Sequence, residues 1–158
     1  MSSQNVTDYL YSRQVSFYKR RHPPAFSAQE VAEKAHISGR RVAKTVVVKL
    51  DGKLALCVLP ATERVNFGLL RQAAGSHTAE LAREEEFIDA FPCCEPGLMP
   101  PFGGLYGLPV YVSDSLKQDI PLAFSSGQAS ELLELSWQDF NRLVHPVLMT
   151  EKQKAAIG

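Results

Sequence analysis

The chain has 158 residues, of which 45% are hydrophobic and 22% charged, so it has the length and composition of one globular domain. Its longest apolar runs are too short to cross a membrane, and the polar residues 1–8 lack the cationic and apolar regions of a signal peptide. We therefore expect a cytoplasmic protein with a single hydrophobic core and no membrane partner.

The formal net charge is zero, but basic residues are concentrated in the first part of the chain. Residues 1–50 hold nine basic and three acidic side chains, a net charge of +6, so the remainder carries −6. This asymmetry suits a protein that meets phosphate groups with one of its sides. A solvated basic helix surface would give the same count, so charge alone leaves both interpretations open.

The first predicted elements are a helix that runs into a strand, followed by a second helix. Residues 6–19 begin with helical spacing and then alternate, and the paired prolines that follow them forbid a continued helix. Ser27 and Glu30 have the spacing of a capping box, in which each side chain satisfies a backbone donor of the other residue. This pattern predicts a helix over residues 28–35.

A β-hairpin and another helix are predicted next. Two apolar runs, residues 43–50 and 53–59, flank an Asp-Gly pair, which is a favoured two-residue hairpin turn. Asn66 and Gly75 then have the residue types that begin and end a helix over 67–74.

The second half of the chain is predicted to contain a long loop and several short elements. Three consecutive glutamates at 84–86 favour the first turn of a helix. Residues 92–109 hold four glycines and five prolines, which predicts an irregular loop, and loops of this length are frequently functional. Short strands are predicted at 110–112, 121–124 and 132–135, and a helix capped by Ser136 at 136–143.

These elements predict an α+β fold in a single domain, with a mixed, mostly antiparallel sheet or partial barrel flanked by helices. We expect the domain to span residues 1–150 and residues 151–158 to form a C-terminal tail. The three cysteines, Cys57, Cys93 and Cys94, have neither the number nor the spacing of a disulfide framework or a zinc site. No metal and no cofactor are therefore predicted.

Lys44 is a candidate functional residue because it lies in an otherwise apolar predicted strand. Strand alternation places it on one face with Val46 and Val48. Its aliphatic stem then covers the sheet edge, or its ammonium group points into a cleft. The sequence around the lysine is compatible with both.

The loop at residues 97–104 is a second candidate, because its glycines permit unusual dihedral angles and its prolines stiffen it. Stiff backbone N–H groups can form an oxyanion hole for acyl transfer, although a plain connection has the same composition. No nucleophile motif, phosphate-binding loop or metalloprotease motif is present. Of the four histidines, we expect His36, His77 and His145 to be surface or helix-end residues, whereas His22 lies beside the basic segment.

Four segments in this order carry a resemblance to a known family. They are residues 22–26 (HPPAF), 42–48 (VAKTVVV), 94–103 (CEPGLMPPFG) and 105–112 (LYGLPVYV). In this combination the chain resembles the YbaK/prolyl-tRNA synthetase-associated editing domain family, over about residues 6–147.

The resemblance implies a free-standing trans-editing hydrolase that deacylates mischarged aminoacyl-tRNA, most often tRNA for proline, without a metal or a covalent intermediate. Aminoacyl-tRNA and prolyl-tRNA synthetase are the implied partners. The strand lysine and GxxxP loop of the family fall on Lys44, Gly97 and Pro101 as catalytic residues. The lysine would engage the terminal adenosine, and the loop backbone would polarise the ester carbonyl. The expected substrate-contacting residues are His22, Thr45, Met99, Pro100, Phe102, Gly127 and Ala129.

One position departs from the family pattern. Members that resemble the alanine-specific branch carry a histidine where this chain has Ala129. Alanine, serine, threonine, cysteine and a small non-protein amino acid are all compatible with a pocket altered in this way. The alternative function is a non-catalytic module that binds aminoacyl-tRNA or a synthetase on the same fold, and a third is a small-molecule esterase or regulator.

Overall fold

The computed structural model describes residues 5–91, 94 and 97–150. Within them the α-helices are α1 (Val6–Ser12), α2 (Ala28–Ala35), α3 (Phe67–Ala74), α4 (Glu84–Phe87) and α5 (Trp137–Val144). The 3-10 helices are η1 (Ile88–Ala90), η2 (Gly103–Tyr106) and η3 (Asp114–Leu116). The strands are β1 (Tyr18–Arg21), β2 (Ala43–Leu50), β3 (Lys53–Pro60), β4 (Ala79–Leu81), β5 (Val110–Ser113), β6 (Leu122–Ser125), β7 (Glu131–Leu135) and β8 (Val147–Met149).

The described strands form two open sheets, so the fold is a mixed α+β domain and not a closed barrel. The smaller sheet has the order β1-β7-β6 and is antiparallel, and the larger has the order β4-β2-β3-β5-β8. In the larger sheet β5 runs parallel to both β3 and β8, which makes that sheet mixed. A parallel bridge between Val42 and Ala123 connects the start of β2 to β6.

Helix boundaries follow the capping residues that the sequence predicts. The side chains of Ser27, Asn66 and Ser136 each accept a hydrogen bond from the backbone N–H three residues later, at the start of α2, α3 and α5. Gly75 ends α3 in the left-handed conformation. His36 and His145 end α2 and α5 in the same conformation, which confirms their helix-end positions.

The hairpin of β2 and β3 is also confirmed, with Leu50 paired to Lys53 across a two-residue turn. Asp51 and Gly52 both have positive φ, as this tight turn requires. Two strands were not predicted, β4 and β8, which have three residues each and pair with the ends of β2 and β5. Three residues are too few to show alternation in a sequence.

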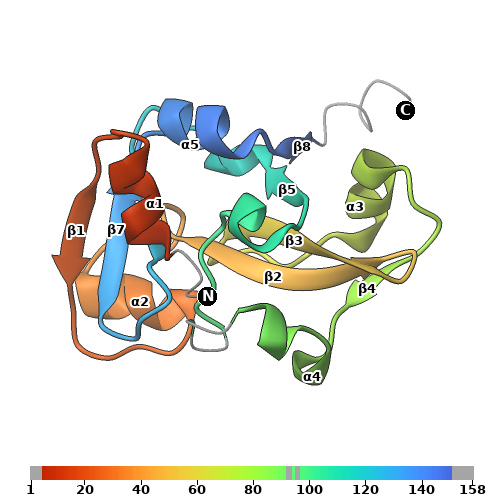
Figure 1. Cartoon of the computed structure of the whole chain (residues 1–158), viewed down its shortest axis with the longest axis horizontal. Helices are drawn as coiled ribbons and strands as arrows, with labels where there is room; N and C mark the ends of the chain where they lie inside the picture. Colours follow the sequence, from red (N-terminus) through yellow and green to blue (C-terminus); the bar gives the residue numbers. More distant parts are fainter. Residues whose placement is uncertain (1–4, 92–93, 95–96, 151–158) are drawn as a thin grey trace.

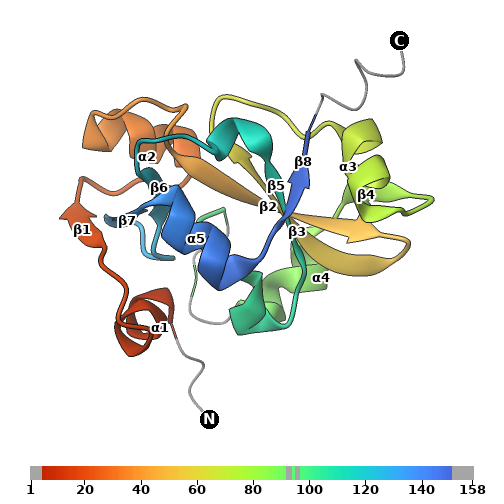
Figure 2. The ribbon, with the colours of Figure 1, turned by 90° about the horizontal axis from the view of Figure 1, so that it is seen from above.

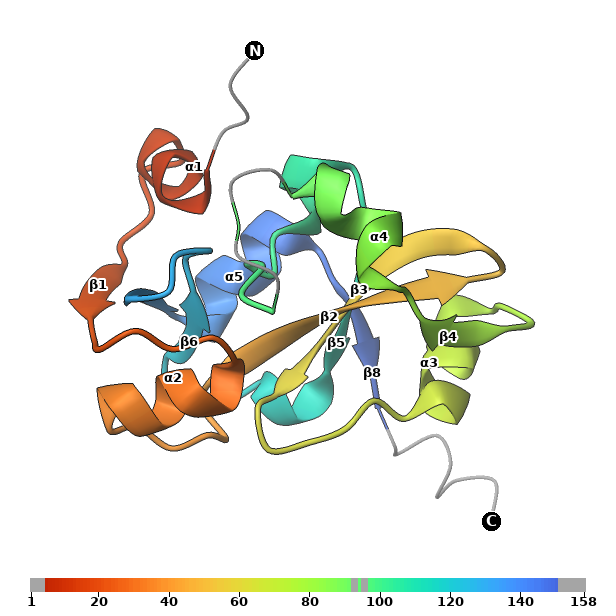
Figure 3. The same cartoon turned by 90° about the horizontal axis from the view of Figure 1, so that it is seen from below.

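Hydrophobic side chains fill the space between the two sheets and their covering helices. In the largest buried cluster the Phe102 ring contacts the rings of Phe124 and Phe140, and the cluster includes Trp137 of α5. Smaller clusters lie under α2 and under α3. Figure 1 shows the smaller sheet with α1 and α2 at one end of the molecule and α3 at the other. Figures 2 and 3 show the same separation of α2 and α3 from above and below.

No described helix has both the length and the apolar character needed to cross a membrane. The predicted tail at residues 151–158 lies outside the described part of the chain, as does Cys93. The last described residues before that tail belong to β8, which is paired to β5.

Candidate functional site

Lys44 is the second residue of β2 and is half-buried. It shares a face of the sheet with Val42 and Val46 and lies opposite Leu59 of β3. Burial raises the pKa of the nearby Cys57 thiol to about 12, and the positive charge of Lys44 acts on it in the opposite direction. Within the described residues the Lys44 ammonium group forms no ion pair.

Thr45 follows Lys44 in β2, so its side chain lies on the opposite face, with Ala43 and Val47 of the main core cluster. Thr45 is buried, and its hydroxyl oxygen has no hydrogen-bond partner among the residues that the structure describes. Buried hydroxyl groups nearly always form a hydrogen bond, so an unpaired one is a candidate position for a bound ligand or water. A substrate can contact both Lys44 and Thr45 only at the edge of β2.

The loop that follows residue 96 approaches the chain just before α2. Gly97 has φ +87°, and a Cβ added to it would lie 3.2 Å from the carbonyl oxygen of Phe26. Leu98 is buried in one cluster with Ala25, Val42 and the half-buried Ala129. The loop is therefore held against the start of β2 on the face that carries Lys44.

The remainder of the loop is anchored in the core. Met99, Pro100, Pro101 and Phe102 are all buried, and the Phe102 ring lies 5.4 Å from Phe124, measured between centroids. These contacts give Met99 and Phe102 an anchoring position under the loop. Their contact with a substrate stays a prediction.

His22 is buried and is positioned by two hydrogen bonds. Its backbone N–H donates to Ser130, and its Nδ1 donates to the Pro23 carbonyl at 2.8 Å. Because a carbonyl only accepts, Nδ1 carries a proton in this hydrogen bond. Nε2 is buried and has no partner in the described part of the chain.

Gly127 and Ala129 lie in the turn between β6 and β7. Gly127 has φ +105° and donates its N–H to the Ser125 hydroxyl at 3.1 Å. The Ala129 carbonyl accepts a hydrogen bond of 2.8 Å from the Ala25 N–H. The turn is thus tied to the segment that follows His22.

The structure therefore brings four distant segments to one junction between the two sheets. They are residues 22–26, the start of β2, the loop at residue 97 and the β6–β7 turn. Lys44 lies on the face of β2 that carries Val42, which packs in one cluster with Leu98 and Ala129, and Thr45 lies on the other face. Sequence reasoning missed Phe26 and Leu98, whose apolar side chains give no chemical signal although both lie in the motif segments.

A cavity of about 470 Å³ lies on the same side of the larger sheet, between β3, α3 and η3. Cys57 and Leu59 line it, together with residues 63–66 and 113–115. Its lining includes neither Lys44 nor residues 97–102, so it is separate from the junction. No group of three or more His, Cys, Asp or Glu side chains among the described residues is placed to hold a metal ion.

Ion pairs bring together basic and acidic residues that are far apart in the sequence. Four basic residues of the N-terminal segment pair with carboxylates from the acidic remainder: Lys19 with Glu131, Arg20 and Arg41 with Glu134, and Lys49 with Glu80 and Glu86. Within the described residues, the other five have no such partner: Arg13, Arg21, Lys34, Arg40 and Lys44. The cationic surplus is therefore smaller than the sequence count indicates, and Lys44 belongs to it.

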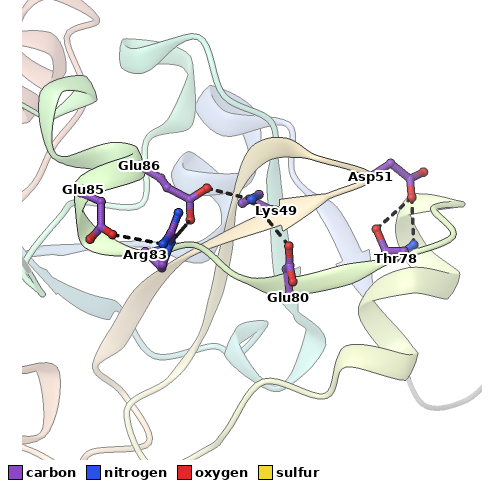
Figure 4. Close-up of polar contacts among 7 residues, drawn as sticks. All are labelled: Lys49, Asp51, Thr78, Glu80, Arg83, Glu85 and Glu86. Carbon is purple, nitrogen blue, oxygen red and sulfur yellow. Dashed lines mark hydrogen bonds and ion pairs between the residues drawn. The ribbon is translucent and has the colours of Figure 1, made fainter.

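The pairing of Lys49 is shown in Figure 4, where its ammonium group lies between Glu86 and Glu80. The hydrogen bond from Lys49, at 2.8 Å, is the main cause that lowers the pKa of Glu86 to about 2. The same bond raises the pKa of Lys49. Asp51, at the hairpin turn, accepts from the backbone of Thr78 and His77, which lowers its pKa. This network attaches α4 and β4 to β2.

Comparisons with known proteins identify a family profile and solved structures of similar fold. A profile of the aminoacyl-tRNA editing domain family matches residues 22–143. The fold is similar to the crystal structure of a hypothetical protein, with a TM-score of 0.81 and 21% identity over 92% of this chain and 97% of that one. It is also similar to a candidate trans-editing enzyme for prolyl tRNA synthetase, with a TM-score of 0.78 and 19% identity over 90% and 91% of the two chains. No curated protein sequence matches the chain.

Proposed function

Because the chain belongs to the aminoacyl-tRNA editing domain family, we propose that it is a trans-editing hydrolase. Its substrate is tRNA for proline that carries a small wrong amino acid, and it acts in the cytoplasm. Water adds to the ester carbonyl carbon, the bond to the ribose oxygen breaks, and that oxygen takes up a proton. The products are the free amino acid and uncharged tRNA. One solved structure of similar fold is described as a candidate enzyme of this kind.

The observation that carries the proposal is that Lys44 forms no ion pair among the described residues. Lys49 lies five residues later in the same strand and contacts two carboxylates. Lys44 is half-buried and forms no ion pair with a carboxylate in the described residues, so its charge is available to an anionic group of a ligand. The phosphate or ribose of the terminal adenosine supplies that partner, as the family resemblance implies.

The loop supplies the second requirement, a rigid main chain beside the lysine. Residues 98–102 are buried, and Gly97 is held against the Phe26 carbonyl. A preorganised backbone donor is effective in acyl transfer because it does not reorganise during the reaction. Gly97 and Pro101 are therefore assigned to the loop that polarises the ester carbonyl.

The choice of amino acid depends on the turn at Ala129. Its methyl group packs with Ala25 and Leu98, so this part of the junction has an apolar wall of small side chains. Such a wall discriminates weakly between substrates that differ by one methylene, by about 1–3 kcal/mol. We propose a small amino acid as the substrate and leave alanine, serine, threonine and cysteine as the panel to be tested.

The absence of a histidine at position 129 favours one other function, a non-catalytic module that binds aminoacyl-tRNA or a synthetase. The panel separates the two functions. Each of the four amino acids is esterified to tRNA for proline, and the half-life of the ester is measured with and without protein. Binding without any shortened half-life at stoichiometric protein supports the module and contradicts the hydrolase.

The assignment of Lys44 is tested by Lys44→Ala. We expect deacylation of the preferred substrate to fall at least 100-fold, because the cation that positions the terminal adenosine is lost. The melting temperature should stay close to that of the wild type, since no described ion pair is removed. Lys53→Ala is the matched control, because Lys53 is exposed at the far end of the same hairpin. Full activity in Lys44→Ala would refute the assignment.

A further inference from the structure

On the outer edge of β2, the backbone N–H and C=O groups of Thr45 have no hydrogen-bond partner among the described residues. In an antiparallel pair the backbone groups of alternate residues point toward the partner strand. The Ala61 N–H donates to Val42, so the even-numbered residues of β2 face β3. The N–H and C=O groups of the odd-numbered residues, which include Thr45, consequently point away from β3.

Neighbouring segments occupy this outer edge on both sides of Thr45. Before it, Ala123 donates to the Arg41 carbonyl at 2.9 Å within the parallel bridge to β6. After it, the Ala82 N–H donates to the Val47 carbonyl at 3.0 Å, where β4 begins to pair with β2. Within the described residues no hydrogen bond reaches the N–H or C=O of Thr45 from this side.

The side chain of Thr45 adds an independent sign of an absent partner. Its hydroxyl oxygen is buried without a hydrogen bond. Buried backbone and hydroxyl groups are rarely left unpaired, because the loss of water costs free energy that only another hydrogen bond offsets. One donor, one acceptor and one hydroxyl group thus converge at a single residue, next to Lys44.

We infer that the backbone of Thr45 binds the aminoacyl group of the substrate through the pair of hydrogen bonds that two residues exchange in neighbouring antiparallel strands. The inference rests on the proposed function and specifies how the same site holds its substrate. An aminoacyl ester has one backbone unit, with an α-ammonium donor and a carbonyl acceptor. The Thr45 N–H donates to the ester carbonyl, and the Thr45 carbonyl accepts from the α-ammonium group.

The length of the vacant edge favours this ligand over a peptide. Successive outward-facing residues of a strand repeat about every 7 Å. The bonds at Arg41 and Val47 lie about 20 Å apart along the strand and close the edge on both sides, so a peptide strand longer than a few residues would meet β6 or β4. A single aminoacyl unit fits between them, and its ester then lies at the edge where both Lys44 and Thr45 can be reached.

The test removes one backbone donor without changing a side chain. In the full-length protein the amide N–H of Thr45 is replaced by an ester oxygen, with the α-hydroxy analogue of threonine incorporated at this position. The matched control is the same replacement at Val47, the next outward-facing residue. Each replacement also makes the carbonyl of the preceding residue, which faces β3, a weaker hydrogen-bond acceptor. The hairpin is therefore affected equally in the two variants. Deacylation kinetics and melting temperature are measured for both.

We expect the replacement at Thr45 to lower kcat about 100-fold, the effect of removing one oxyanion donor. The replacement at Val47 should change kcat less than about threefold at a similar melting temperature. Equal activity in the two variants, whether high or low, overturns the inference. In the wild type, N-acetylation of the aminoacyl group should lower kcat/KM at least tenfold, and no effect of acetylation overturns the role of the Thr45 carbonyl. A wild-type protein that hydrolyses no aminoacyl-tRNA instead contradicts the proposed function itself.

Discussion

At the scale of single residues, the proposed function rests on groups that have no partner among the described residues. Lys44 and Lys49 occupy the same strand, yet only Lys49 is neutralised by carboxylates. Thr45 and His22 each have a buried polar atom without a hydrogen bond. Both residues lie next to the junction where the motif segments meet. Unsatisfied groups of this kind are costly in a fold and are expected where a ligand completes them.

Gly97 allows a prediction at this scale. Gly97→Ala places a methyl group in a left-handed conformation and against the Phe26 carbonyl, so the loop must shift. Gly107→Ala is the control, because Gly107 has φ +71° but open space around its Cβ position. Both variants should lose about 1 kcal/mol of stability in urea unfolding from backbone strain. Only Gly97→Ala should lose deacylation, by about tenfold or more, and equal activity in the two variants would contradict the role of the loop.

At the scale of elements, the ion pairs around Lys49 hold α4, which precedes the loop at residues 97–104, against β2. Glu86 of α4 contacts Lys49 of β2, and Arg83 also contacts Glu86 (Figure 4). Helix α4 has only four residues, too few to be stable by itself. Its position therefore depends on these side-chain contacts with the sheet.

This dependence predicts an acid-sensitive contribution to stability. The pKa of Glu86 is lowered to about 2 in the folded chain from its ordinary 4.5. Its contribution is therefore complete above pH 4.5 and is lost as the pH falls toward 2. Glu86→Gln should be less stable than the wild type at pH 6, and the difference should shrink below pH 4.5 in urea unfolding. Glu84→Gln, at an exposed position of the same helix, should show no such convergence. A constant difference for Glu86→Gln from pH 6 to 2 would contradict the linkage.

At the scale of the whole molecule, Glu134 joins the two sheets. Arg41, which precedes β2, donates to its carboxylate at 2.8 Å and to the Pro121 carbonyl. Arg20 of β1 donates to the same carboxylate at 3.2 Å and to the last residue of α2. Glu134 is 12% exposed, so water screens these contacts less than those at the surface.

Glu134→Gln should therefore destabilise the fold by about 1.5–3 kcal/mol, the range for hydrogen bonds to charged groups. Urea unfolding at pH 7 measures the change. Glu85→Gln is the control, because Glu85 is 70% exposed in its pair with Arg83 and should contribute less than about 1 kcal/mol. Similar losses of stability in the two variants would show that the connection between the two sheets does not depend on Glu134.

The sequence by itself determined the helix starts, the hairpin and the resemblance that identifies the family. Capping residues, the Asp51-Gly52 turn and the glycine- and proline-rich loop act over a few neighbouring positions, so their consequences can be read locally. The separation of basic and acidic residues was also visible, but not its outcome. Lys19, Arg20, Arg41 and Lys49 find carboxylates that are distant in the chain, which only folding brings near.

The tertiary structure alone decided which groups remain without partners and where they meet. Strands β4 and β8 are defined by pairing and not by pattern, and the junction unites segments that are about 100 residues apart. The backbone groups of Thr45 have no partner among the described residues because β4 pairs with β2 only after Thr45, and the bridge to β6 lies before it. Whether a backbone group is paired depends on where the neighbouring strands run, and no local pattern in the sequence determines this.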